Sequence, residues 1–243
     1  MTRWQKKFLY GLFYIIIFGL IIWVFIPSPS IPAPVCSDPS CGTNQPLPLR
    51  VSGVPQMFKS ESTHRVVVLG QVTNPNPDYG AYVFSYNFII FNHDGRTIIS
   101  VPGSGKIYPS ETKYILSVYD AGNMDLSLVA ERPGFEVKNA SFRPAAEFLK
   151  PNLILTSKPE TNVSSLGIKV TGRVKNQNAS PVGGIRVISV LQDTYGDSVF
   201  AAQTLIQGLN SFEEAPFEVN FPADPAVVQK IDPVKTSVLL SEN

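Results

Sequence analysis

The sequence predicts an all-β protein, made of two tandem antiparallel β-sandwiches that follow one transmembrane α-helix. Three observations lead to this fold class: a long uncharged apolar run near the N-terminus, period-two alternation through much of the remaining chain, and a repeat about 100 residues apart. Of the 243 residues, 44% are hydrophobic and 16% are charged. That balance supplies a folded core and carries too little charge for a disordered chain.

The apolar run covers residues 8–26, and none of its 19 residues is charged. As a helix it would extend about 28 Å, close to the roughly 30 Å hydrocarbon core of a bilayer. The basic residues of the tip, residues 1–7, precede it, and the next basic residue is Arg50. By the positive-inside tendency, the tip stays in the cytoplasm and the chain after residue 26 lies outside.

A cleaved signal peptide is the alternative interpretation of this run. The apolar stretch of such a peptide usually has about 7 to 15 residues and ends in a small-x-small cleavage site. Here the run is longer, and Pro-Ser-Pro-Ser follows it. The sequence therefore favours an uncleaved signal anchor.

Residues 27–48 form the predicted tether, in which seven of the 22 residues are proline. Such a composition favours an extended, semi-rigid spacer. Cys36 and Cys41 lie within it, and an oxidising compartment favours a disulfide between them. Free or intermolecular thiols are the alternative. A metal or redox pair is disfavoured, because neither a histidine nor a C-x-x-C spacing accompanies the two thiols.

Two short motifs recur in the chain at an offset of 101 or 102 residues. The first copy contains Gly70, Val72, Asn74, Asn92 and Gly95, and the second contains Gly172, Val174, Asn176, Asp193 and Gly196. The repeat divides the exported part into a first β-sandwich domain, residues 49–150, and a second, residues 151–243. Each is of a normal domain size.

The repeated residues have physical roles in a β-sandwich. Gly70 leaves room for a bulge or for a closely packed neighbour. Asn74 ends its strand, where an Asx turn redirects the chain. Asp94 and Gly95 form a tight-turn signal, because glycine accepts a positive φ angle. The second copy is expected to follow the same plan, with residues 195–197 as a weaker turn signal.

Alternating side chains mark the strands. Residues 168–174 alternate apolar and polar side chains, which predicts a half-buried strand with one wet face. An aromatic stripe at alternate positions is interpreted as sandwich core, and it consists of Tyr82, Phe84, Tyr86 and Phe88. Tyr79 and Tyr82, near the start of that strand, are the candidates for exposed rings that contact a ligand. Residues 224–230 predict a single helical turn capped by Asp224.

The first copy resembles an FxLYD domain, a small immunoglobulin-like β-sandwich module of exported and membrane-anchored prokaryotic proteins. The resemblance rests on Gly70-x-Val72-x-Asn74, on the namesake stretch Phe88 to Asn92 with Gly95 after it, and on Ile107-Tyr108-Pro109 as a later turn. The second copy departs from the family at Ser189 and Gln192, where the family has aromatic residues. The resemblance implies two tandem immunoglobulin-like modules in a membrane-anchored bacterial envelope protein, and it carries no catalytic residues.

No pattern in the sequence indicates catalysis, a metal site or a cofactor. The only histidines, His64 and His93, fall at predicted turns. The glycines of residues 101–106 lack the spacing of a phosphate loop, so this segment is interpreted as a loop between strands. Glu213 and Glu214 are adjacent, and neighbours on a strand point to opposite faces. We therefore expect a protein that is not an enzyme and holds no cofactor.

These features predict a single-pass protein of the cytoplasmic membrane, with its N-terminus inside and its two β domains outside. The lipid bilayer is the expected partner of residues 8–26. The expected partner of the β domains is an unidentified envelope protein or surface ligand. Three of the 20 basic residues lie in the tip, which leaves 17 basic against 19 acidic residues outside, so nucleic acid is not an expected partner. An accessory subunit of an envelope enzyme complex and a passive structural spacer are the alternatives.

If Cys36 and Cys41 are joined, the tether will be lighter by two hydrogen atoms without reductant than with it. Mass spectrometry of the alkylated full-length chain under both conditions measures this difference. Because the ring is small, the substitution Cys36→Ser should change the free energy of unfolding little. Alkylation of both thiols in the absence of reductant would contradict the disulfide.

Overall fold

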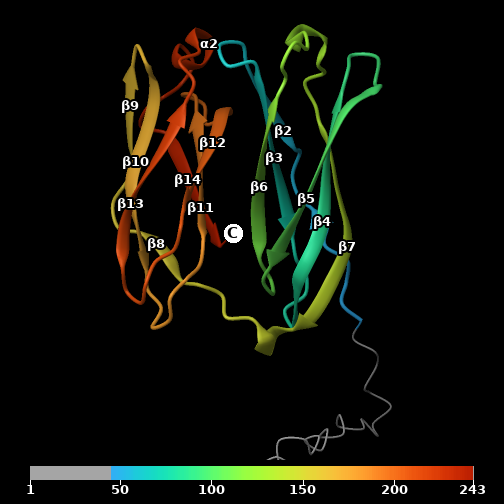
Figure 1. Ribbon diagram of the computed structural model, residues 1–243, viewed down its shortest axis with the longest axis vertical. Coiled ribbons are helices and arrows are strands. Elements are labelled where there is room, and N and C mark those ends of the chain that lie inside the picture. Colours follow the sequence, from blue (N-terminus) through green and yellow to red (C-terminus); the bar gives the residue numbers. More distant parts are fainter. Residues whose placement is uncertain (1–44, 243) are drawn as a thin grey trace, which may run out of the picture. The chain divides into compact units, whose positions relative to one another are not determined.

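The computed structural model describes residues 45–242, and nearly all of its regular structure is antiparallel β-sheet (Figure 1). The predicted all-β class is confirmed. Within the described residues, no helix is both long and apolar enough to cross a membrane. The predicted anchor at residues 8–26 and the two tether cysteines, Cys36 and Cys41, lie outside the described residues.

The strands form four sheets, numbered I to IV here. Sheet I contains β1 (Arg50–Val51), β2 (Gln56–Ser60), β3 (Arg65–Thr73) and β6 (Thr112–Asp120), and sheet II contains β4 (Tyr79–Phe91), β5 (Thr97–Ile107) and β7 (Gly134–Pro144). Sheet III contains β8 (Leu153–Leu155), β9 (Glu160–Ser164), β10 (Gly167–Asn176) and β13 (Glu214–Phe221), and sheet IV contains β11 (Ile185–Gln192), β12 (Ser198–Ile206) and β14 (Thr236–Glu242). Three helical turns lie between strands: η1 (Leu126–Leu128), η2 (Ala145–Glu147) and α2 (Pro225–Val228).

Sheets I and II form the first module, and sheets III and IV form the second. The two modules have the same strand order. In sheet I, β3 pairs with β1 and β2 on one side and with β6 on the other, and β10 pairs in the same way with β8, β9 and β13. In sheet II, β4 lies between β5 and β7, just as β11 lies between β12 and β14 in sheet IV. The similarity found in the sequence therefore extends to the topology.

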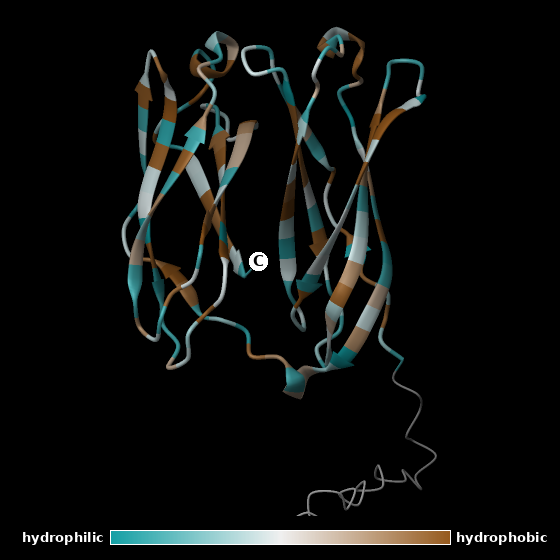
Figure 2. Cartoon of the chain, viewed as in Figure 1, coloured by the Kyte–Doolittle hydropathy of each residue, from teal (hydrophilic) through white to brown (hydrophobic). Residues whose placement is uncertain are grey.

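Each module has an apolar core between its two sheets. In the first, Val66 and Val68 of β3 belong to the same buried cluster as Phe84 and Phe88 of β4. In β10, the predicted alternation holds, since Val170 is fully buried while Lys169 is exposed. Figure 2 shows such alternation of hydrophobic and hydrophilic residues along the strands. The prediction that the aromatic stripe supplies core residues is confirmed at the two phenylalanines.

Tyr82 is exposed, as predicted for this tyrosine of the stripe: the pairing register shifts between Ala81 and Phe84, and its ring is 57% exposed. One expectation about sheet II is wrong. Residues 101–106 are not a loop, because they lie within β5 and pair with β4. Pro102 is tolerated in this strand because β5 is at the edge of its sheet and needs no second set of hydrogen bonds.

The buried Asn74 side chain is a hydrogen-bonding node at the end of β3. Its Nδ2 donates to the backbone oxygens of Tyr79, at 2.7 Å, and Tyr108, at 2.9 Å. Its Oδ1 accepts from the backbone nitrogen of Asn76 at 3.1 Å. The predicted Asx turn is confirmed, and the same side chain also ties the β3–β4 connection to the turn before β6.

Asn176 forms the equivalent node in the second module. Its Nδ2 donates to the backbone oxygens of Ser180 and Asn210, both at 2.9 Å, and its Oδ1 accepts from the backbone nitrogen of Asn178 at 2.9 Å. Asn176 is fully buried. An amide fits this position because it donates and accepts at once, whereas a carboxylate could only accept.

The glycine before each node has a closely packed neighbour. A Cβ atom on Gly70 would lie 2.7 Å from the ring of Phe135, and one on Gly172 would lie 2.6 Å from the ring of Phe217. The pairing of β3 and β10 has no register shift at either glycine. Of the two roles predicted for these glycines, close packing is therefore the correct one.

The predicted turns are present. Gly95 has a φ of 77° and Gly196 a φ of 93°, in the hairpins that join β4 to β5 and β11 to β12. The helical turn α2 begins with Pro225, as predicted, after the cap residue Asp224. However, the Asp224 side chain makes no capping hydrogen bond and instead accepts from the backbone nitrogen of Ser62 at 3.5 Å.

The substitution Asn74→Ala should lower the free energy of unfolding by about 3 kcal/mol, because it leaves the buried carbonyls of Tyr79 and Tyr108 without their donor. Chemical denaturation followed by intrinsic fluorescence measures this. Asn220→Ala is the matched control, because Asn220 is exposed and bonds only Glu218; its effect should stay within about 0.5 kcal/mol. Equal effects of the two substitutions would show that Asn74 is not a structural node.

Candidate functional site

The outer faces of sheets I and IV pack against each other and join the two modules. Phe58, Val67 and Leu69 of sheet I lie in the same buried cluster as Ile188 and Val190 of sheet IV. Each of these side chains is less than a tenth exposed. As a result, β3 and β11 are buried on both faces, as central strands of layered sheets are. From Pro46 onward the chain forms one compact unit.

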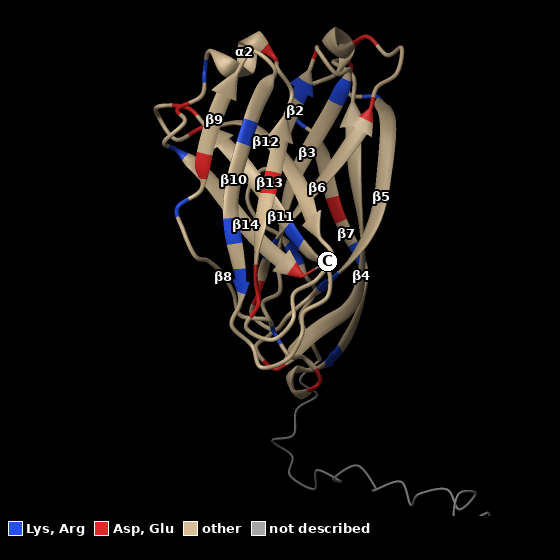
Figure 3. Ribbon diagram, turned by 60° about the vertical axis from the view of Figure 1, so that its left-hand side comes forward, with Lys and Arg blue, Asp and Glu red and all other residues tan. Residues whose placement is uncertain are grey.

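A polar cluster lies beside this contact and joins β5 and β6 to the end of β14. We name it the Glu242 clamp; it consists of Lys106, Tyr108, Lys113 and Glu242. The Glu242 carboxylate accepts a hydrogen bond from Lys106 Nζ at 3.0 Å and another from the Tyr108 hydroxyl. Lys113 Nζ donates to the backbone oxygens of Lys106, at 3.0 Å, and Glu242, at 2.9 Å. Figure 3 shows the charged end of β14 next to the C-terminal label.

The environment of the clamp shifts the pKa values of Tyr108, Lys113 and Glu242. Burial raises the pKa of the Tyr108 hydroxyl, and its hydrogen bond to Glu242 raises it further. Burial lowers the pKa of the Lys113 ammonium. For Glu242, burial alone would favour the neutral acid, but the hydrogen bonds from Tyr108 and Lys106 together hold the pKa of the carboxyl below its usual value. The ion pair of the Glu242 carboxylate with Lys106 therefore supports the junction between the modules.

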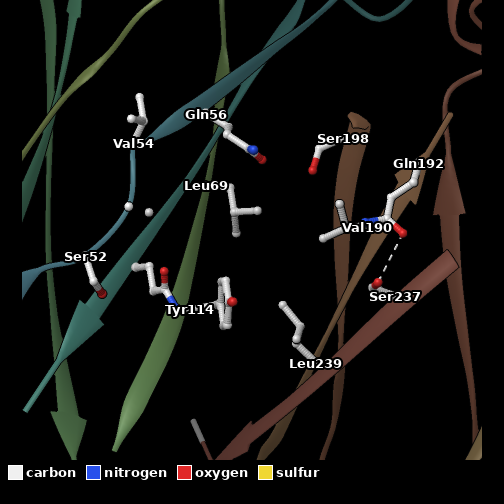
Figure 4. A pocket seen from close by; sticks show the side chains of 13 residues that line it. Ser52, Val54, Gln56, Leu69, Tyr114, Val190, Gln192, Ser198, Ser237 and Leu239 are labelled. Carbon is white, nitrogen blue, oxygen red and sulfur yellow. Dashed lines mark hydrogen bonds between the residues drawn. The ribbon is translucent and has the colours of Figure 1, made fainter. Parts of the chain in front are cut away.

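A cleft of about 330 Å³ lies between sheets I and IV (Figure 4). Its polar side chains are Gln56, Gln71 and Tyr114 from sheet I, Ser52 from the segment after β1, and Gln192, Ser198 and Ser237 from sheet IV. Leu69, Val190 and Leu239 supply apolar surface from the two facing sheets. The cleft thus depends on the packing of the modules, and neither module alone would form it.

The cleft is chemically neutral. The described residues that line it include no carboxylate, histidine, lysine, arginine or cysteine. Ser237 Oγ donates to Gln192 Oε1 at 3.4 Å, and no other side-chain hydrogen bond joins residues of the cleft. The side-chain amides of Gln56 and Gln71 form no hydrogen bond with any other group among residues 45–242. They are therefore available to an uncharged ligand that both donates and accepts hydrogen bonds.

The sequence-predicted site residues lie elsewhere. Tyr79 is half-buried at the start of β4, and the guanidinium of Arg143 lies 5.2 Å from the ring centre of the exposed Tyr82. Neither tyrosine lines the cleft. The repeated motif residues other than Gly70 also lie outside it, and they position strands and turns.

Sequence reasoning missed the cleft residues because no local pattern marks them. They come from strands and turns that are far apart in the chain, and glutamine and serine are ordinary surface residues. One signal in the sequence pointed to the interface behind them, because residues Val66–Leu69 are apolar at four consecutive positions. A strand with one solvent-exposed face would alternate apolar and polar residues, so this run indicates burial on both faces.

The histidines and the adjacent glutamates singled out in the sequence do not come together among the described residues. No three of the described histidine, cysteine, aspartate and glutamate side chains cluster to hold a metal ion. His93 Nε2 bonds the backbone oxygen of Ser127 at 2.8 Å on an exposed turn. Glu213 bonds the backbone nitrogen of Asn210, whereas Glu214 bonds Arg173, so the two adjacent carboxylates have different partners.

Comparisons with known proteins identify no relative. No family model matches the chain, and no curated protein sequence matches it. Among solved structures, the transglutaminase of red sea bream is 10% identical, with a TM-score of 0.26 over 72% of this chain and 27% of that one. β-Glucuronidase 2 of Bacteroides uniformis is 9% identical, with a TM-score of 0.24 over 73% of this chain and 28% of that one. This chain spans little more than a quarter of either protein, and at these TM-scores neither match carries an argument about fold or function.

Glu242→Gln should weaken the junction, because it removes the charge that Lys106 and Tyr108 stabilise. We expect the free energy of unfolding to fall by roughly 1 kcal/mol at neutral pH. Since the pKa of Glu242 is lowered in the folded chain, this stabilisation is present above the usual carboxyl pKa of about 4.3 and is lost as the pH falls through the lower folded value. The difference between wild type and variant should therefore vanish in acid.

Denaturation curves from neutral pH down to acid test this expectation. Glu136→Gln is the control, because Glu136 pairs only with the exposed Lys138 of the same strand. A difference for Glu242→Gln that persists at low pH would contradict a role for its charge.

Proposed function

We propose that this chain is a single-pass membrane protein that displays two immunoglobulin-like β-sandwich modules of FxLYD type outside the cytoplasmic membrane. Residues 8–26 anchor it in the bilayer, and the Pro-rich tether separates the anchor from the modules. Its role is to bind an envelope protein or a surface ligand, rather than to catalyse a reaction. The apolar run, the basic tip and the repeated motifs support this proposal.

The neutral cleft between sheets I and IV is the observation that carries the binding role. It combines apolar surface with amide and hydroxyl groups, and that combination is typical of sites that recognise uncharged ligands or a peptide backbone. Its walls come from both modules, and the apolar contact and the Glu242 clamp hold those walls together. A preformed site of this kind costs a ligand little reorganisation.

The same cleft argues for binding over catalysis. General acid–base chemistry needs a titratable side chain within hydrogen-bonding reach of the reacting atoms, and a covalent mechanism needs an activated nucleophile. The serines that line the cleft, such as Ser198, have no histidine, lysine or carboxylate beside them among its lining residues. The hydroxyls can therefore donate and accept hydrogen bonds but have no base to activate them.

A photoreactive phenylalanine derivative at Gln56 tests the proposal in the full-length chain, in its native membranes. We expect a discrete adduct after illumination, because position 56 lines the cleft. The substitution Ser198→Trp, which fills the opposite wall, should abolish that adduct. The same photoreactive group at the exposed Asn220, which lies outside the cleft and borders a separate cavity of about 190 Å³, is the control and should give none.

Mass analysis of the adduct distinguishes a protein from a smaller envelope ligand. Adducts that form equally at positions 56 and 220, or that survive Ser198→Trp, would exclude the cleft as the binding site. No adduct at position 56 would leave the passive spacer as the better description.

A further inference from the structure

The edge strand β14 lacks the features that usually protect a sheet edge. It lies at one side of sheet IV, and no other described strand pairs with its free side (Figure 1). Edge strands usually carry charges, prolines or bulges that prevent further pairing. From Thr236 to Ser241, β14 has no charge and no proline, and its pairing with β11 has no register shift.

Several other edges among the described strands are protected. β5 contains Pro102, β13 contains Pro216, and β7 carries charged side chains and register shifts. β12, at the opposite edge of sheet IV, also lacks charges. One cavity beside it, of about 260 Å³, has Leu205 as its one apolar side chain, and another, of about 190 Å³, is lined by Phe200 and Ala201 against sheet I. The edge of β14 combines a free backbone along most of a seven-residue strand with apolar surroundings, which it shares with the three-residue edge strand β8.

One backbone hydrogen bond just before β14 shows which backbone groups of this strand face β11 and which face its free side. Gln192 donates its backbone N–H to the oxygen of Lys235, and these two residues continue the register in which Leu191 lies opposite Thr236. In an antiparallel pair, hydrogen-bonded and non-hydrogen-bonded positions alternate. The backbone groups of Thr236, Val238 and Leu240 therefore point away from β11, toward the free side.

A slot of about 440 Å³ opens beside this free edge. Leu153 and Leu155 of β8 form one wall, Val238 and Leu240 of β14 form another, and Thr112 lies at its border. The four apolar side chains are only partly buried against the second core. The slot thus lies between the edges of sheets III and IV, beside the start of β6.

The side chains of sheet IV next to this slot are smaller than their counterparts in the first module. In the first module, the rings of Phe88 and Phe135 stack at 4.3 Å across β4 and β7. At the equivalent pair of the second module, Ser189 of β11 lies opposite Val238 of β14. Ser189 is fully buried, and its Oγ has no hydrogen-bond partner among the described residues. Two large rings are thus replaced by two small side chains beside the open slot.

We propose that β14 accepts an extended segment of a partner protein as an added strand. The segment pairs with the free backbone groups of Val238 and Leu240, and its alternate apolar side chains enter the slot beside Leu153 and Leu155. Backbone pairing supplies affinity, and the apolar slot selects the sequence. This inference rests on the proposed binding role but uses a slot next to the cleft, with which it shares the lining residues Tyr114 and Leu239.

The occupant is a single extended chain rather than the sheet edge of a second copy. The backbone oxygen of Glu242 already accepts a hydrogen bond from Lys113 Nζ, and residues 111 and 112 border the slot. The first module therefore stands beside the end of β14, where the neighbouring strands of a whole added sheet would have to lie.

Selection from a phage-displayed library of random decapeptides against the full-length chain in lipid nanodiscs tests this proposal. We expect enriched peptides that alternate apolar and polar residues. Val238→Pro removes an outward N–H without breaking the β11 ladder, and Leu153→Lys places a charge in the slot without altering β14. Each should weaken binding of a selected peptide at least tenfold. Leu205→Lys, on the edge strand β12, is the matched control and should not change it.

Amide hydrogen exchange of the chain gives an independent readout. A bound peptide should slow exchange of the Val238 and Leu240 amides at least tenfold and leave that of Leu239, which already bonds β11, unchanged. The cleft variant Ser198→Trp should retain peptide binding, so failure of the cleft and failure of this edge can be distinguished. Any of three results would overturn the proposal. These are no enrichment of alternating peptides, unchanged peptide binding by both Val238→Pro and Leu153→Lys, and no slower exchange of the Val238 and Leu240 amides.

Discussion

Sheets I and IV can face each other because β3 and β11 carry apolar side chains on both of their faces. The inner side chains, such as Val68 and Val187, fill the two module cores, and the outer ones, such as Leu69 and Ile188, fill the space between the modules. Each added layer removes further apolar surface from water, at about 25 cal/mol per Å². The cleft and the Glu242 clamp both lie along this contact, so their geometry depends on it.

The two modules share the same strand topology and buried asparagines, but different side chains fill their apolar cores. The Asn74 and Asn176 nodes are alike in donors, acceptors and spacing. Gly70 and Gly172 each lie under an aromatic ring, but in the first module the ring is Phe135 of β7, and in the second it is Phe217 of β13. The polar nodes are constrained by hydrogen-bond geometry, whereas an apolar core needs only that its total volume be filled.

Local residue patterns predicted much of the fold and little of the site. Period-two alternation, the Asn-His-Asp-Gly turn and the repeated glycine and asparagine indicated strands, hairpins and a duplication, because each depends on neighbours in the chain. The exposure of Tyr82 was predicted, but the register shift beside it and the strand that includes Pro102 were not, since both depend on the pairing of β4 with β5. Gln56, Gln71 and Gln192 meet only after the modules pack, and no spacing in the sequence relates them.

The shared direction of the two modules has a mechanical consequence. The hairpin at Asn92–Arg96 and its equivalent at Asp193–Asp197 lie at the same end of the compact unit (Figure 1). The apolar contact fixes the separation of these hairpins, as a flexible linker would not. A partner with two sites at matching separation would bind the second with a high effective concentration, and one with mismatched sites would gain nothing. A junction of this kind would therefore favour a multivalent partner whose two sites match the separation of the hairpins.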